Sequence, residues 1–122
     1  MIQSHIITIG DEILSGHIVD TNAKWLSEKL YSIGVKTTKR ITISDDENQI
    51  KRTINSSINR SDIIIVTGGL GPTNDDITKK TLCRIYNSNL IQDKKSLDNI
   101  SKIFLKRGLE LTKKNMDQAL VP

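Results

Sequence analysis

Short apolar runs alternate along this chain with segments of helical periodicity, and few folds accommodate such an alternation. The runs at residues 5–10, 35–43 and 62–67 have the apolar or β-branched character of strands. Because helical segments of about 13 residues separate them, the strands are expected to lie parallel in one sheet with helices on both faces. The pattern predicts an α/β fold, a three-layer α/β/α sandwich with a mostly parallel sheet.

Capping residues and glycines set the expected ends of the helices. Asp20 or Thr21 begins a helix that stops before Gly34, and Asp45 or Asp46 begins the next one. Further helices are predicted at residues 76–86 and 96–107, with a short one at 115–120. The apolar side chains expected to face inward from the helices are Ala23, Leu26, Leu30, Ile33, Ile50, Ile54, Ile58, Ile77, Leu82 and Ile85. Alternation in the second strand is expected to place Val35, Thr37, Lys39, Ile41 and Ile43 on one side.

The composition fits one cytoplasmic domain covering residues 1–122. No apolar run approaches the roughly 18 residues that cross a bilayer, so no membrane association is expected. The single cysteine, Cys83, excludes an intramolecular disulfide. The net charge is +4, and the basic excess lies after residue 76, where lysines have helix-surface spacing. Such scattered cations indicate a solvated face and do not favour nucleic-acid binding.

The loops that follow the three strands carry the candidate chemistry. Ligands of open parallel sheets bind outside the carboxyl ends of the strands, so these loops are expected to share one rim. Glycines between a strand and a helix let backbone N–H groups approach a phosphate, and Ser15, Thr67 and Thr73 add hydroxyl donors. The glycines alone suit a structural turn equally well. The predicted phosphate or ligand contacts are Gly10, Glu12, Ser15, Gly16, Thr67, Gly68, Gly69, Gly71, Thr73 and Asp75.

All three loops also carry paired carboxylates, at residues 11–12, 45–46 and 75–76. Six acids would repel a phosphate unless a hard cation lay between them. The combination predicts metal-assisted phosphoryl or pyrophosphate chemistry with Mg²⁺, Mn²⁺ or Co²⁺. The alternative for any single aspartate is that it caps a helix. His5, His17 and Trp25 are expected to have non-catalytic roles.

The same loops closely resemble those of the CinA competence/damage-inducible family. The matching segments are residues 10–16 (GDEILSG), 20–23 (DTNA) and 67–78 (TGGLGPTNDDIT). Proteins of this family begin with a domain similar to the molybdopterin-binding domain of MoaB and MogA. The resemblance therefore implies a molybdopterin-binding (MogA-like) fold and a homo-oligomer, dimeric or trimeric. It further implies metal-dependent hydrolysis of ADP-ribose or a related nucleoside diphosphate.

The resemblance also implies roles for single residues. Gly68, Gly69 and Gly71 with Thr67 would hold a phosphate. Asp45 and Asp76 match aspartates of the MoaB and MogA relatives, which implies that they bind the metal or activate water, with Asp75 and Glu12 as accessory acids. The family domain continues beyond Pro122 into another strand and loop, so the fold is expected to be incomplete at its C-terminal end, and no segment resembles the amidohydrolase domain that some members carry.

Two other functions stay open at this point. One is molybdopterin binding or adenylylation, as in molybdenum-cofactor assembly. The other is a non-catalytic module that acts through oligomerisation. For the hydrolase and for the molybdopterin protein alike, the expected ligand is a nucleotide or a pterin phosphate.

Overall fold

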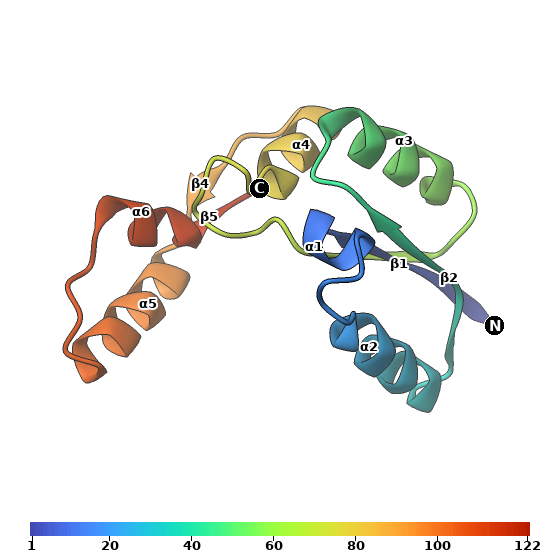
Figure 1. Ribbon diagram of the computed structural model, residues 1–122, viewed down its shortest axis with the longest axis horizontal. Helices are drawn as coiled ribbons and strands as arrows, with labels where there is room; N and C mark the ends of the chain where they lie inside the picture. The colour runs from blue at the N-terminus through green and yellow to red at the C-terminus, as the bar shows by residue number, and fades with distance from the viewer. The chain divides into compact units, whose positions relative to one another are not determined.

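The computed structural model describes residues 1–122, which divide into two compact units, Met1–Gly69 (unit 1) and Leu70–Pro122 (unit 2). Unit 1 contains β1 (Ile2–Ile9), α1 (Asp11–Leu14), α2 (Thr21–Ser32), β2 (Val35–Ile43), α3 (Glu47–Ile58) and β3 (Ile63–Thr67). Unit 2 contains α4 (Thr78–Ile85), β4 (Ile91–Gln92), α5 (Lys94–Lys106), α6 (Lys113–Met116), the 3-10 turn η1 (Asp117–Ala119) and β5 (Leu120–Val121). Figure 1 shows these elements in chain order from blue to red.

Unit 1 is built on a parallel sheet with the strand order β2-β1-β3, which confirms the predicted α/β class. Helices α2 and α3 cover opposite faces of this sheet (Figure 1). The predicted caps hold, because Asp20 accepts a hydrogen bond from the Ala23 backbone and Asp46 accepts one from Gln49. Because the three strands are parallel, their carboxyl ends lie at the same edge of the sheet.

Aliphatic side chains fill both faces of the sheet. Ile6, Ala23, Leu30 and Val35 form the cluster beneath α2. On the α3 face, the side chains of Ile7, Ile9, Ile50 and Ile54 are almost completely buried. Burying each of these isoleucines contributes roughly 1.5–3 kcal/mol relative to leaving it exposed. The sheet and its strand ends are therefore held from both sides.

Two inward positions were predicted wrongly. Ile33 is 74% exposed because α2 ends at Ser32, so the helical period no longer applies to it. Ile58 is 42% exposed, and Ser57 is buried instead, three residues after Ile54. Helical spacing permits a step of three or four residues, and here the shorter step brings a serine against the sheet.

The predicted alternation of β2 is also wrong, because a register shift between Ser4 and His5 leaves Thr38 without an opposite residue in the ladder with β1. This bulge adds one residue to β2 and exchanges the two faces of the strand beyond it. Thr37 pairs with Ser4 on the α2 face, whereas Lys39 pairs with His5 on the α3 face. Ile41 and Ile43 thus reach the α3 face, on the opposite side from Val35.

Unit 2 differs from its predicted pattern at both ends. Helix α4 begins at Thr78 rather than at residue 76 and buries Thr78, Thr81 and Cys83, while Ile77, Leu82 and Ile85 are only half-buried. The expected helix at 115–120 is replaced by α6, η1 and β5, and β5 pairs antiparallel with β4. A two-residue strand pair carries no periodicity that a sequence pattern reveals. No helix has the length and apolarity that crossing a membrane requires.

Candidate phosphate and metal site

The loops after β1 and β2 and the glycine turn that directly follows β3, at Gly68 and Gly69, meet at the carboxyl edge of the sheet in unit 1. The backbone N–H of Gly10 donates to the carbonyl of Ile43 at 3.0 Å, which joins the first loop to the end of β2. Gly68 lies against the carbonyl of Ile9 at the end of β1. The sequence pattern therefore located this part of the rim correctly, and the position of residues 70–75 at it stays a prediction.

Two aspartates connect the first two loops. The Asp11 carboxylate accepts hydrogen bonds from the Ser44 hydroxyl at 2.5 Å and from the Asp45 backbone at 3.3 Å. The Asp45 carboxylate in turn accepts a longer one, 3.4 Å, from the Asp11 backbone. These reciprocal hydrogen bonds hold the first two loops together, with one carboxylate on each. Asp11 was not among the predicted metal ligands, although it follows the end of β1 much as Asp45 follows the end of β2.

The turn after β3 requires glycine for two reasons. Gly68 has φ = 87° and Gly69 has φ = 62°, the left-handed region that disfavours other residues. A Cβ placed on Gly68 would lie 1.9 Å from the carbonyl oxygen of Ile9. The backbone of this turn is consequently in direct contact with the end of β1, where successive left-handed or turn conformations form concave anion sites.

The remaining residues predicted in the first loop lie beside this rim. The Glu12 carboxylate lies over Gly10, since a Cβ there would meet its Oε1 at 2.8 Å. The Ser15 hydroxyl lies 2.6 Å from Nδ1 of His17, and both side chains are exposed. Gly16 has φ = 83° with open space around it. No local pattern in this loop predicted the contact between Ser15 and His17.

In unit 2, Asp76 closes its own loop. Its Oδ2 accepts hydrogen bonds from the Thr73 hydroxyl at 2.5 Å and from the Thr73 backbone at 3.1 Å. The Thr73 hydroxyl is the main reason that the pKa of Asp76 lies below its ordinary value, with backbone hydrogen bonds and Lys79 acting in the same direction. A Cβ on Gly71 would lie 2.6 Å from the same Oδ2, so the loop passes close to the carboxylate. Asp76 is therefore ionised and fixes the turn, whereas Asp75 beside it is exposed.

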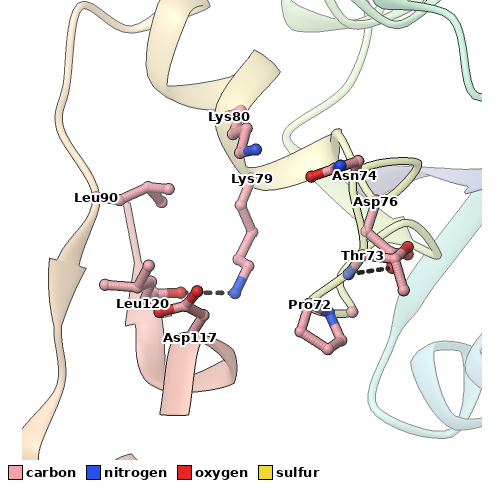
Figure 2. A pocket seen from close by; sticks show the side chains of 10 residues that line it. Pro72, Thr73, Asn74, Asp76, Lys79, Lys80, Leu90, Asp117 and Leu120 are labelled. Atoms are coloured by element: carbon pink, nitrogen blue, oxygen red, sulfur yellow. Dashed lines mark hydrogen bonds between the residues drawn. The ribbon is translucent and has the colours of Figure 1, made fainter. Parts of the chain in front are cut away.

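A pocket of about 130 Å³ opens next to this loop within unit 2. Figure 2 shows Lys79 extending across it, with Nζ donating to the carbonyl of Leu120 at 2.8 Å. This bond ties α4 to β5. The pocket is lined by Gly71, Pro72, Thr73, Asn74, Asp76, Lys79, Lys80, Leu90, Asp117 and Leu120.

Two carboxylates of unit 1, those of Asp11 and Asp45, are the residues that could hold a divalent cation. Neither unit contains a group of three or more His, Cys, Asp or Glu side chains placed to hold a metal. Mg²⁺ does not need one, because it commonly binds through one or two carboxylates together with phosphate oxygens and water. Asp11 and Asp45 supply such a pair. The predictions that Asp76 shares a metal with Asp45, and that all six acids converge, stay predictions.

Residues 5–118 match a family described as "Probable molybdopterin binding domain". The chain is 46% identical over 121 residues to a CinA-like protein of Cytophaga hutchinsonii, covering 99% of this chain. It is 44% identical over 119 residues to a putative competence-damage inducible protein of Caldicellulosiruptor saccharolyticus. The chain spans 29% of the length of each of these two relatives.

Solved structures agree with the sequence relatives. The crystal structure of CinA from Thermoplasma acidophilum, described as a protein of unknown function, superposes with a TM-score of 0.82 at 31% identity, covering 98% of this chain and 70% of that one. MoaB from Thermus thermophilus, described as a molybdopterin biosynthesis enzyme, superposes with a TM-score of 0.66 at 20% identity over 98% of this chain and 71% of its own, which establishes a shared fold. The chain therefore belongs to the family of molybdopterin-binding-type domains and, within it, to the CinA-like proteins.

Proposed function

We propose that this domain binds a nucleoside diphosphate of the ADP-ribose type at the carboxyl edge of β1, β2 and β3 and hydrolyses its pyrophosphate with the help of a divalent cation. One observation carries the proposal. The carboxylates of Asp11 and Asp45 lie on adjoining loops at the same edge as the glycine turn of Gly68 and Gly69.

The glycine turn supports the phosphate half of this proposal. A side chain at Gly68 would collide with Ile9, so the backbone alone forms this part of the rim. Backbone N–H groups bind phosphate oxygens without a mobile side chain and therefore lose little entropy on binding. The Ser15 hydroxyl, on the neighbouring loop, is the proposed additional donor.

The paired carboxylates support the metal half. Two ionised side chains beside an anion raise its free energy unless a cation lies between them. Asp11 and Asp45 would hold that cation, and their hydrogen bonds to Ser44 and to each other's backbone fix the direction of both carboxylates. A bound divalent ion supplies Lewis-acid polarisation of the phosphoryl oxygens and lowers the pKa of a water ligand.

Molybdopterin binding is the second candidate, and the family match is the observation that favours it. A pterin phosphate would use the same glycine turn, because that turn recognises the phosphate group and not the ring. The two functions differ in their second substrate. Adenylylation of a pterin consumes ATP, whereas pyrophosphate hydrolysis consumes only water.

The test is a calorimetric titration of ADP-ribose into the 122-residue protein, with and without Mg²⁺, scored beside AMP release from the same sample. We expect metal-dependent binding and AMP formation. Asp45→Asn and Asp11→Asn each keep an oxygen that can accept the present hydrogen bonds but remove a charge. Each is expected to lose the metal dependence and to reduce turnover by roughly a hundredfold or more.

The matched control is Asp98→Asn, which removes a charge from an exposed position on α5. It should leave binding and turnover unchanged. Binding without AMP release, combined with ATP-dependent labelling of molybdopterin, would replace hydrolysis by the pterin function. Absence of binding to either ligand would contradict both proposals and leave a non-catalytic module.

A further inference from the structure

Strand β2 forms one edge of the sheet in unit 1. It is nine residues long and pairs with β1 along one side only. A strand in this position has backbone N–H and C=O groups that are available to a further strand. The length of β2 exceeds the short edge strands with which proteins commonly avoid such pairing.

The side chains along this edge are cationic. Lys36, Lys39 and Arg40 are exposed, and β2 contains no acidic residue. None of the three forms an ion pair. The bulge at Thr38 distributes the charge, since Lys39 pairs with His5 on the α3 face and Arg40 pairs with Ile6 on the α2 face. An added strand would therefore meet positive charge on both of its faces.

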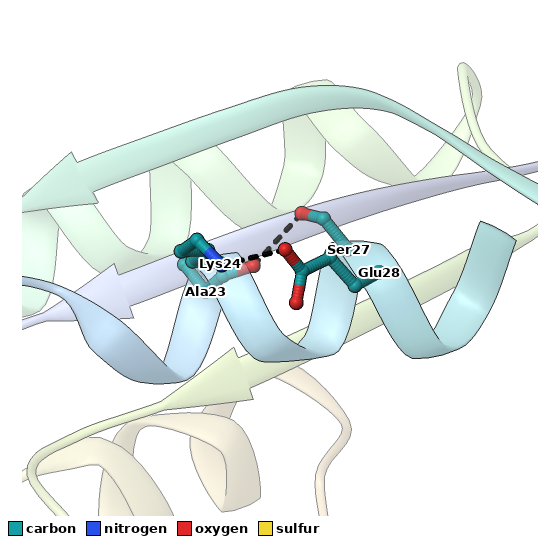
Figure 3. A network of polar contacts seen from close by, with 4 residues as sticks. All are labelled: Ala23, Lys24, Ser27 and Glu28. Carbon is teal, nitrogen blue, oxygen red and sulfur yellow. Dashed lines mark hydrogen bonds and ion pairs between the residues drawn. The ribbon is translucent and has the colours of Figure 1, made fainter.

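A groove accompanies the edge between α2 and β2. It has a volume of about 310 Å³ and is lined by Ser27, Thr37, Thr38, Lys39 and Arg40. Its lining thus combines two cations with three hydroxyl groups and no carboxylate, and the hydroxyls already form hydrogen bonds within unit 1. The single acidic residue of α2, Glu28, already pairs with Lys24 at 2.6 Å (Figure 3), which leaves the cations of the groove without an internal counter-ion.

Charge decides between two kinds of occupant for this edge. A second copy of the chain that paired β2 with β2 would place lysine and arginine against lysine and arginine, and like charges directly opposite each other destabilise a sheet. An extended segment with acidic side chains on both faces would gain main-chain hydrogen bonds and ion pairs together. We infer that the β2 edge is a docking site at which an extended acidic segment of a partner protein adds as a further strand, with one acidic side chain in the groove beside Arg40.

Protection against aggregation is the competing explanation, because lysines on an edge strand also prevent unwanted pairing. Repulsion alone requires charge but no groove beside the strand. The two explanations predict different binding behaviour for an acidic peptide. Protection by charge does not produce saturable binding that depends on the peptide backbone, whereas docking does.

The experiment uses the 122-residue protein labelled with ¹⁵N and an acetylated, amidated heptapeptide, Val-Glu-Glu-Val-Glu-Glu-Val. We expect saturable chemical-shift changes concentrated in residues 35–43 and slower amide exchange along β2. The double substitution Lys39→Glu with Arg40→Glu should weaken binding at least about tenfold. The same peptide methylated on alternate backbone nitrogens should bind at least about tenfold more weakly, because those nitrogens no longer donate.

Lys113→Glu with Lys114→Glu is the matched control, since it makes the same change of charge at exposed positions on α6. Its affinity should stay close to that of the parent protein. The docking site is refuted if no saturable binding occurs, if the control loses as much affinity as the β2 variant, or if the methylated peptide binds equally well. The dispersion of each variant's spectrum shows whether the fold is intact, and Arg40→Glu alone provides the milder test.

Discussion

Gly68 has no side chain at a point in the structure where none fits. Its φ of 87° costs a residue with a Cβ roughly 1–3 kcal/mol. The contact with Ile9 adds a second, independent cost. A Cβ on Gly68 would collide with the carbonyl oxygen of Ile9, which belongs to the backbone of β1 and cannot move away by changing a rotamer. Conformation and contact thus act together at one residue, and they hold the turn after β3 against the end of β1.

Gly34 separates these two effects and provides the control for a substitution at Gly68. Its φ is 82°, but a Cβ there would have nothing within 4 Å. We expect Gly34→Ala to lower the free energy of unfolding by about 1–2 kcal/mol. Gly68→Ala should cost about 3 kcal/mol or more, since β1 and the turn must also separate. Urea denaturation of both variants measures the difference, and equal losses would contradict the contact with Ile9.

Single residues were also the most predictable features of unit 1. Asp20, Gly34 and the glycines after β3 each have a local reason to occupy their positions, and a local reason is readable in the sequence. The bond between Asp11 and Ser44 joins residues 33 positions apart, and no local pattern carries that information. The rim was therefore predictable, whereas the pairs of side chains within it were not.

The bulge in β2 is the feature of a secondary-structure element that most changes the sheet. The residues before and after Thr38 pair with consecutive residues of β1, so Thr38 is the extra residue. Deleting it would leave every other pair of the ladder in place. Simple alternation along residues 35–43 fails as a prediction for the same reason, because a period of two does not reveal where an unpaired residue is inserted.

Deletion of single residues from β2 tests this assignment. Removing Thr38 should keep the fold, with a melting temperature within about 5 °C of the parent. Removing Thr42 should abolish the cooperative transition, because the alternation of Ile41 and Ile43 is then lost and one of the two must leave the α3 face. Circular dichroism during heating measures both outcomes. If the two deletions behave alike, the register shift is not where the structure has it.

At the scale of the whole molecule, the apolar core lies mainly in unit 1. Its buried side chains include the isoleucines of β1 and α3, whereas unit 2 buries Thr78, Thr81, Cys83 and Ala119. The alternation of apolar runs and helices predicted the parallel α/β sheet of the first unit in outline, but not the order of its strands. The second unit was harder to predict, because short strands, a 3-10 turn and polar buried residues carry little hydrophobic periodicity.

The core of unit 1 contains one titratable group, and it makes the stability of the protein depend on pH. His5 is 2% exposed, and its Nδ1 has no hydrogen-bond partner. Burial, followed by the nearby charges of Lys39 and Arg60, holds the pKa of His5 below its ordinary value. The folded protein therefore keeps the imidazole neutral at a pH where the unfolded chain, with a pKa of about 6.5, binds a proton.

The sign of the effect follows from proton uptake. Below a pH of about 6.5 the unfolded state binds more protons than the folded state, so the free energy of unfolding decreases as the pH falls, and the full contribution is present above that pH. Asp76 and Asp93, whose pKa values are lowered by hydrogen bonds, contribute stability that is lost only around pH 4 and below.

We expect urea denaturation between pH 7.5 and about 5.5 to show a steady loss of the free energy of unfolding in the parent protein. His5→Leu removes both the proton site and the unpartnered nitrogen, so its stability should vary less over the same range. Equal slopes in the two proteins would mean that His5 is solvated rather than buried beneath α3.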